Sequence, residues 1–236
     1  MQNHEPTPKP VSPLIWLSVT IVYLSFPAIL IGLGRDVVWW QAWLYSGLIF
    51  LGGVGGRVLG ERAHPGLMQE RLNPDREGNV KGWDKVLSPL MSLTIAYPAA
   101  IVAGMDHNRG WSEPFPLWVN LLGGLLCALG LAGAVWALIV NPFFSSMVRI
   151  QEDRLHRVIE NGPYALVRHP GYAGNVLAMI GMVMLLGSNW AGLASSLGLA
   201  VCFLRTALED GALMEELPGY RVYAAKVRWR LIPFVW

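Results

Sequence analysis

Two polar clusters interrupt a largely apolar sequence, and their residue types are those that bind charged ligands or move protons. The first, residues 156–174, reads HRVIENGPYALVRHPGYAG. The second, residues 205–230, begins with an Arg and a Glu and ends with tyrosines and basic residues. Such side chains are costly near a membrane unless they have a function. Each cluster imposes a geometry that indicates what it could bind.

The first cluster predicts an open helix N-terminus. Residues 167–169 lead into Pro170 and are expected to be extended, and Pro170 suits the first turn of a following helix. The free N–H groups and the positive end of the helix dipole can hold a carboxylate or a phosphate. His169 would lie at the entrance of this site and Tyr172 in its first turn.

The second cluster places a cation and an anion on one helix face. Arg205 and Glu209 are four residues apart, so they share a face where an apolar helix meets the interface. One interpretation is an arginine that reaches toward water and forms a salt bridge with the glutamate. The other is a charged pair that lines a binding site. Tyr220 and Tyr223, beside basic residues, could belong to the site or anchor the chain at a membrane surface.

The elements that position these clusters are membrane helices. The chain has 236 residues, of which 53% are hydrophobic and only 14% charged, whereas a soluble domain carries about 25% charged residues. An apolar helix of about 20 residues crosses a bilayer core. We therefore predict an all-α, multi-pass integral membrane bundle with five or six spans. The expected apolar segments are residues 14–33, 39–59, 86–105, 117–140, 173–187 and 190–204.

The last two of these segments are about 15 residues each, so we expect two thin spans or a tight re-entrant hairpin. Residues 60–85 are too polar to span and predict a short interfacial helix with a loop. Residues 1–13 predict a short flexible tail before a retained first span rather than a cleaved signal. We divide the chain into an N-terminal membrane domain of four spans, residues 1–140, and a C-terminal region, residues 141–236, with the hairpin and a cytoplasmic tail.

The distribution of basic residues predicts the orientation. With the N-terminus inside, sixteen of the eighteen Lys and Arg residues fall on the cytoplasmic side, and only Arg35 and Arg109 lie outside. The positive-inside rule favours this arrangement, which puts both polar clusters on the cytoplasmic side. In a bacterium the membrane would be the inner one.

Several classes of function are disfavoured. The net charge of +2 gives no footprint for nucleic acid. Cys127 and Cys202 lie in apolar segments without a neighbouring His or a CxxC pattern, so we expect small core residues and no metal site. The GGVGG at residues 52–56 lacks a βαβ context and predicts close helix packing rather than a nucleotide loop. The expected partners are membrane lipid and an apolar small molecule.

The combination of motifs is more specific than any one of them. GPYxxVRHPxYxG, a helical hairpin, RxxxE and then GYxxYxxxVRWRLIP resemble the isoprenylcysteine carboxyl methyltransferase family, over residues 141–236. A looser resemblance extends to integral-membrane methyltransferases that act on phospholipids and thiols. The segment Lys81-Gly82-Trp83-Asp84-Lys85 is similar to bacterial members, but less specifically.

The resemblance implies S-adenosylmethionine as cofactor, bound without a soluble Rossmann domain. It assigns Arg205 to the substrate, and Arg205, His169 and Glu209 are our candidate catalytic residues. Position 210 is Asp where the family commonly has Glu, and Pro218 precedes Gly219; both departures concern substrate specificity. The cofactor-binding residues implied by position are Gln151, His156, Arg157, Val158, Ile159, Tyr164, His169, Pro170, Gly171, Tyr172 and Glu209.

The expected function is methyl transfer from S-adenosylmethionine to an apolar or membrane-embedded acceptor, foremost a carboxylate of the isoprenylcysteine type. An anionic acceptor needs no base, whereas an amine or thiol would need His169 or Glu209 as base. Phospholipid or thiol methylation stays open as an alternative. So does an NADPH-dependent membrane reductase of the sterol-reductase type, and a non-catalytic scaffold or lipid-binding protein.

Overall fold

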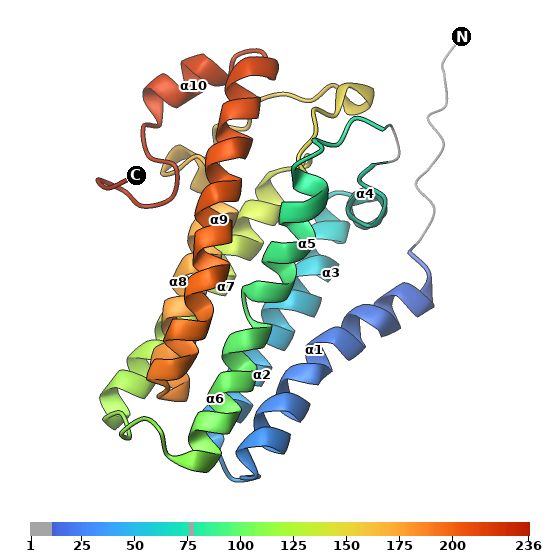
Figure 1. The fold of residues 1–236 in the computed structure, drawn as a ribbon. Coiled ribbons are helices and arrows are strands. Elements are labelled where there is room, and N and C mark those ends of the chain that lie inside the picture. The colour runs from blue at the N-terminus through green and yellow to red at the C-terminus, as the bar shows by residue number, and fades with distance from the viewer. Residues whose placement is uncertain (1–10, 76–77) are drawn as a thin grey trace.

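A computed structural model describes residues 11–75 and 78–236, and every regular element in these ranges is helical (Figure 1). The fold class predicted from the sequence is confirmed. The tail predicted over residues 1–13 lies mostly outside the described residues. The helices are α1 Pro13–Gly34, α2 Trp40–Phe50, α3 Gly56–Ala63, α4 Leu67–Leu72, α5 Asp84–Thr94, α6 Tyr97–Arg109, α7 Leu117–Val140, α8 Pro170–Leu186, α9 Asn189–Glu216 and α10 Tyr220–Lys226.

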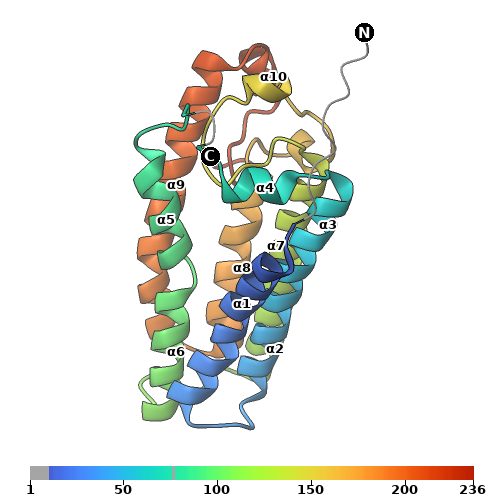
Figure 2. The same cartoon turned by 90° about the vertical axis from the view of Figure 1, so that its right-hand side faces the viewer.

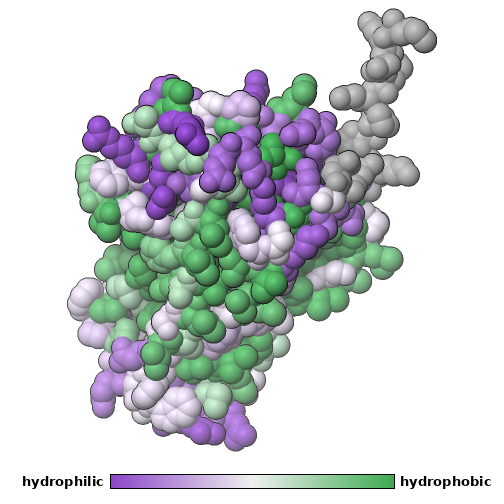
Figure 3. Space-filling model, turned by 45° about the horizontal axis from the view of Figure 1, so that its top comes forward, coloured by the Kyte–Doolittle hydropathy of each residue, from purple (hydrophilic) through white to green (hydrophobic). Residues whose placement is uncertain are grey.

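Five helical segments are long and apolar enough to cross a membrane, and α8 is a shorter apolar helix. The five are Pro13–Gly34, Trp40–Ala63, Asp84–Arg109, Leu117–Val140 and Asn189–Glu216. A bundle of this kind satisfies its backbone hydrogen bonds internally, as the bilayer core requires. In Figure 3 a broad hydrophobic surface lies below a cap of hydrophilic residues. The chain is thus an integral membrane protein.

Two of the spans are not regular α-helices throughout. A π-helical turn, Leu51–Gly55, joins α2 to α3. The third span breaks between α5 and α6, where Ala96 leaves the helical region (φ −132°). Pro98 lacks the N–H that would bond the carbonyl of Thr94 in a continuous helix, so the break follows from the sequence. At this break α9 comes close, because a Cβ on Gly198 would lie 2.5 Å from the oxygen of Thr94.

The predicted hairpin exists, but its second arm is longer than expected. Gly187 ends α8 with φ 67°, and Ser188 caps α9 by accepting from the N–H of Ala191. Helix α8 has 17 residues, close to the short span expected. Helix α9 has 28 residues and continues through Arg205 to Glu216. Residues 205–216 are rich in Ala, Leu, Met and Glu, which favour helix. Arg205 and Glu209 therefore lie on one helix, as predicted.

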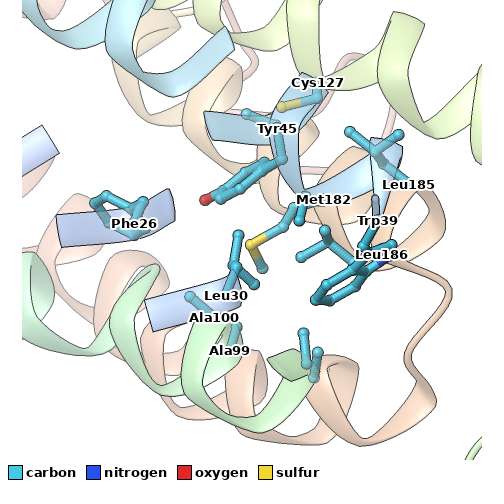
Figure 4. Packing of buried hydrophobic residues seen from close by; sticks show 14 residues of the cluster. Phe26, Leu30, Trp39, Tyr45, Ala99, Ala100, Cys127, Met182, Leu185 and Leu186 are labelled. Carbon is cyan, nitrogen blue, oxygen red and sulfur yellow. The ribbon is translucent and has the colours of Figure 1, made fainter. Parts of the chain in front are cut away.

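The core lies where α1, α2, α6, α7 and α8 meet (Figure 4). It is built from side chains that include Phe26, Leu30, Tyr45, Cys127 and Met182. Cys202, like Cys127, is a buried free thiol, as predicted. Figure 2 shows α8 in the middle of the bundle, between α5, α6 and α9 on one side and α2, α3 and α7 on the other.

Helices α7 and α8 pack backbone to backbone through glycines. A Cβ on Gly123 would lie 2.3 Å from the nitrogen of Leu185, and one on Gly130 would lie 2.5 Å from the nitrogen of Ala178. The backbones of the two helices are therefore in close contact at these glycines, whereas Gly133 has no atom within 4 Å of its Cβ position. The contact holds α8, and with it the first polar cluster, against α7.

Helix α4, the loop between α7 and α8, and α10 gather at the same end of the bundle (Figure 1). This end also receives the C-terminal half of α9. Both polar clusters are thus on one side, although 35 residues, which form α8 and the first part of α9, separate His169 from Arg205. We therefore expect the functional site at this end of the bundle.

Candidate active site

A cavity of about 230 Å³ opens at the polar end, between α4, α5, α8, α9 and the loop that precedes α8. The structure brings together every site residue predicted from the sequence, since all twelve line this cavity. They are Gln151, His156, Arg157, Val158, Ile159, Tyr164, His169, Pro170, Gly171, Tyr172, Arg205 and Glu209.

The N-terminus of α8 forms one wall, as the sequence predicted. The N–H of His169 donates to the carbonyl of Arg230 at 2.9 Å, and Arg168 pairs in the same way with Trp229. His169 precedes the first turn with φ −123°, Pro170 begins it, and no side chain caps it. The two N–H groups of Gly171 and Tyr172 have no partner four residues earlier in a helix, so this turn can bind an anion.

His169 lies between two carboxylates. Its Nε2 is 3.2 Å from Oδ1 of Asp210, and its Nδ1 is 4.0 Å from Oε1 of Glu209. Asp210 is fully buried and also accepts hydrogen bonds from Tyr220 at 2.9 Å and Arg230 at 2.8 Å. Asp210 therefore holds the imidazole through Nε2. Glu209, on the Nδ1 side, has 23% of its side chain exposed and lines the cavity.

A tyrosine hydroxyl connects the two charged residues of α9. Tyr172 donates to Oε2 of Glu209 at 2.6 Å and accepts from Nη1 of Arg205. The direct salt bridge between Arg205 and Glu209, one of the two sequence interpretations, does not form. Arg205 instead pairs with Asp84 at the start of α5, through Nε at 2.6 Å and Nη2 at 2.8 Å.

The loop between α7 and α8 is held by its own polar side chains. Gln151 is buried and donates through Nε2 to the carbonyl of Phe143 at 2.7 Å. Arg154 donates to Oε1 of Gln151 at 2.6 Å. His156 packs on the Phe143 ring with centroids 4.5 Å apart, and its Nδ1 accepts from the N–H of Gln151 at 3.3 Å. The packed rings of Phe143 and His156, here called the aromatic shelf, line the cavity.

Burial keeps the polar rings of this loop neutral. Burial first, and then the nearby Arg149 and Arg154, lower the pKa of His156 to about 4. A neutral ring is required for Nδ1 to accept the Gln151 bond. Burial likewise raises the pKa of Tyr164, whose hydroxyl accepts from Nδ2 of Asn141 at 3.0 Å. Arg157, Val158 and Ile159 follow along the rim of the cavity.

Sequence reasoning missed several residues of the site. Asp84 was quoted only within the segment 81–85, and Asp210 only as a departure from a family pattern. Asp84 also accepts from the N–H of Val148 at 2.6 Å, so it fastens the loop as well as Arg205. A charged residue beside an apolar helix was the available signal for both. Arg71 and Phe143 also line the cavity, but no pattern in the sequence links them to it.

Within residues 11–75 and 78–236, no group of three or more His, Cys, Asp or Glu side chains could hold a metal ion. One buried donor of the described side chains lacks a partner, Nε of Arg168, and this residue lines the cavity. Its Nη2 lies 3.1 Å from Asp210. The site thus combines an open helix N-terminus, an unused buried donor, an accessible carboxylate and an aromatic shelf.

Comparison with known proteins finds a family match over the same region of the chain. Residues 123–215 match the isoprenylcysteine carboxyl methyltransferase (ICMT) family. The chain is also similar to a probable protein-S-isoprenylcysteine O-methyltransferase of Oryza sativa subsp. indica, with 31% identity over 94 residues, and to its counterpart in subsp. japonica with the same values. These 94 residues are 39% of this chain and 49% of each relative, so the matched part spans about half the length of the curated relatives.

The matched residues run from the middle of α7 to the end of α9 and contain all twelve predicted site residues. The family resemblance seen in the sequence is confirmed for this part of the chain. The comparisons favour a methyltransferase over the reductase alternative, since both relatives are named methyltransferases. Asp84 and Arg71 lie outside the matched residues.

Proposed function

Because residues 123–215 carry the sequence of the isoprenylcysteine carboxyl methyltransferase family, we propose that this protein transfers a methyl group from S-adenosylmethionine to the carboxylate of an isoprenylcysteine-type acceptor. The observation that carries the proposal is the cavity in which the N-terminus of α8 faces Glu209 and Arg205. Residues from two distant segments meet there with charges that match the cofactor.

The residues present fit this cofactor. Its carboxylate suits the uncapped first turn of α8, where Gly171 and Tyr172 supply N–H groups. Its ammonium and sulfonium suit the accessible carboxylate of Glu209. Its adenine suits the shelf made by His156 and the backbone up to Ile159, with Tyr164 nearby. When bound, the cofactor supplies an activated methyl group.

The protein supplies alignment. Methyl transfer is an in-line displacement, so correct placement of donor and acceptor provides most of the rate. Tyr172, fixed by Arg205 and Glu209, and Arg205, fixed by Asp84, form a chain of hydrogen bonds with little freedom. Four of the five N–H groups of Arg205 are used by Asp84, Tyr172 and the carbonyl of Ser146, which leaves one N–H on Nη1 for the acceptor.

An apolar acceptor is supported by a second cavity of about 80 Å³. It is lined by apolar side chains from α2, α7 and α8 and by Ile95 and Ala96 at the break between α5 and α6. Asn175 lines both cavities, so the apolar space lies next to the polar site. We propose that the first 140 residues shape the acceptor pocket and that residues 141–236 bind the cofactor.

The proposed orientation puts the active site and the N-terminus on the cytoplasmic side. The excess of Lys and Arg at the polar end supports it. The acceptor would then enter laterally from the bilayer, and the cofactor from the cytoplasm. If the acceptor is an amine or a thiol, His169 or Glu209 would be the base.

Calorimetry with S-adenosylmethionine and S-adenosylhomocysteine tests the site. Glu209→Gln removes the charge but keeps an acceptor for Tyr172, and Glu215→Gln, on an exposed turn of the same helix, is the matched control. We expect at least about a tenfold loss of affinity, about 1.4 kcal/mol, in Glu209→Gln and no loss in the control. A larger loss for S-adenosylmethionine would place Glu209 at the sulfonium, and an equal loss at the ammonium.

The result that would overturn the proposal is a wild-type protein that binds neither compound, or that gains heat stability from NADPH but not from S-adenosylhomocysteine. The acceptor is identified separately. The purified chain is incubated with a labelled methyl donor and either N-acetyl-S-farnesylcysteine or a lipid extract, and mass spectrometry of the product distinguishes a methyl ester from a methylated amine or thiol.

A further inference from the structure

Arg71, on the short helix α4, is a cation in the cavity without a carboxylate partner among the described residues. Its Nη1 lies 3.5 Å from the carbonyl of Phe144, at the outer limit of a hydrogen bond, and its Cζ lies 5.3 Å from the ring of the same residue. Within residues 11–75 and 78–236 the Arg71 side chain makes this one hydrogen bond and this one ring contact, and no salt bridge. Its fork of donors is therefore mostly unused.

The other buried arginines of the cavity are all neutralised by carboxylates. Arg149 pairs with Glu70 and Asp153, each within 2.9 Å. Arg168 pairs with Asp210 at 3.1 Å, and Arg205 with Asp84. Arg157 is exposed to solvent, which stabilises its charge. Arg71 differs from all of them, because it is half-buried and has neither a counterion nor full hydration.

The surroundings of Arg71 make its charge costly. Burial first, and then the nearby cations Arg57 and Arg205, lower the pKa of Arg71 to about 10, while Tyr23 and Tyr172 raise it. At neutral pH the guanidinium remains charged. A buried charge without a partner is unfavourable, and an anion that entered the cavity would relieve this cost.

Arg71 is also close to the reacting centre. It contacts the carbonyl of Phe144, and Arg205 donates to the carbonyl of Ser146 at 2.9 Å. These two carbonyls belong to residues two apart, a span of about 7 Å at most. In addition, the hydroxyl of Ser146 donates to the backbone carbonyl of Arg71 at 2.7 Å, which fixes α4 against this segment. The two guanidinium groups therefore flank one short piece of chain.

We propose that Arg71 binds the carboxylate of the methyl acceptor, with Arg205 as a secondary contact. The inference rests on the function proposed above. A planar guanidinium matches a carboxylate with two parallel hydrogen bonds. Arg71 has several free donors for such a pair, whereas Arg205 has one N–H left. This assigns acceptor recognition to α4, outside the residues that match the family.

The assignment is consistent with turnover. Transfer forms a bond between a carboxylate oxygen and the methyl carbon and breaks the bond between that carbon and sulfur. An ester and a thioether result, and no proton moves. The acceptor thereby loses the negative charge that Arg71 binds, so the product is held less tightly than the substrate.

The experiment compares N-acetyl-S-farnesylcysteine with its carboxamide, which has the same chain but no charge. Dissociation constants are measured by calorimetry on the full chain in nanodiscs, with and without S-adenosylhomocysteine. We expect the wild type to prefer the acid, Arg71→Gln to reduce that preference at least about tenfold, and Arg71→Lys to keep part of it. Binding of S-adenosylhomocysteine should change less than about twofold in both variants.

Arg62→Gln is the control, since Arg62 is an exposed cation at the same end of the bundle and does not line the cavity. It should keep the wild-type preference. An acid preference that stays undiminished in Arg71→Gln overturns the inference, and so does a wild type that binds acid and amide equally. Where the glutamine variant does not fold, a full wild-type preference in Arg71→Lys overturns it. Failure of the proposed function is seen separately, as absence of S-adenosylhomocysteine binding in the wild type.

Discussion

Two buried aspartates organise the charges of the site. Asp84 neutralises Arg205 and holds the N–H of Val148. Asp210 accepts from His169, Tyr220 and Arg230. In both cases one carboxylate joins segments that are far apart in the sequence. Arg205 and His169, which are proposed to contact ligands, are thus held in place by two aspartates that need not contact a ligand themselves.

Replacing Asp84 should therefore destabilise the fold. Asp84→Asn leaves the buried guanidinium of Arg205 without a counterion, and breaking a buried pair in this way costs about 3–5 kcal/mol. Asp75→Asn is the matched change at an exposed salt bridge with Lys85, and it should have little effect. Denaturation of both variants in detergent, followed by circular dichroism, measures the difference. Equal stability of the two variants would contradict the role given to Asp84.

At this scale the sequence predicted the ligand-facing residues better than their supports. His169, Tyr172 and Glu209 stand out because motifs with Pro, Gly and fixed helical spacing surround them. Asp84 and Arg71 come from an earlier part of the chain, and only the packing of α4 and α5 against the loop reveals that they share a cavity with these motifs. Contacts across such sequence distances have no periodic pattern to read.

Among the elements, the pair α7 and α8 is the scaffold of the first polar cluster. Glycines on both helices let the backbones approach, as Gly130 does against Gly174 and Ala178. Small residues at such contacts are the usual basis of helix association in membranes. The position of His169 at the end of α8 depends on this contact.

Gly130→Ala should weaken the bundle, whereas Gly133→Ala should not. A Cβ at position 130 would lie 2.5 Å from backbone atoms of α8, which must shift, and overpacking of this kind costs about 1–3 kcal/mol. Position 133 is open, and alanine is there the better helix former. Thermal unfolding in detergent compares the two variants on one helix. A loss in Gly133→Ala as large as that in Gly130→Ala would contradict the role given to close packing at position 130.

Element boundaries followed the sequence where composition changes sharply. The predicted span 117–140 has the observed bounds of α7, between prolines at positions 116 and 142. Helix α9 continues from the predicted apolar segment 190–204 into polar residues and ends at Glu216. These polar residues have partners such as Asp84 and Tyr172, which the local sequence does not show. The break at Ile95 and Ala96 was signalled only by Pro98.

In the whole molecule, the polar segments gather at one end of the bundle. The end that contains the cavity carries α4, the loop before α8 and α10, and the opposite end carries short loops such as the one between α6 and α7 (Figure 1). The described chain runs along the bundle axis six times, α8 included, so α9 ends at the same end of the bundle as that where α1 begins (Figure 1). The distribution of Lys and Arg determines which end of a membrane protein faces the cytoplasm, and here we expect the end with the cavity to do so.

Labelling of single cysteines tests this orientation. Glu152→Cys lies in the loop at the cavity end and Glu113→Cys in the loop between α6 and α7, and both positions are exposed. The native Cys127 and Cys202 are buried, so they should react little. In sealed right-side-out vesicles an impermeant maleimide should label Glu113→Cys at once and Glu152→Cys only after the membrane is opened. The reverse pattern would invert the topology. Labelling of both from one side would mean that α7, the helix that joins these two loops, does not cross.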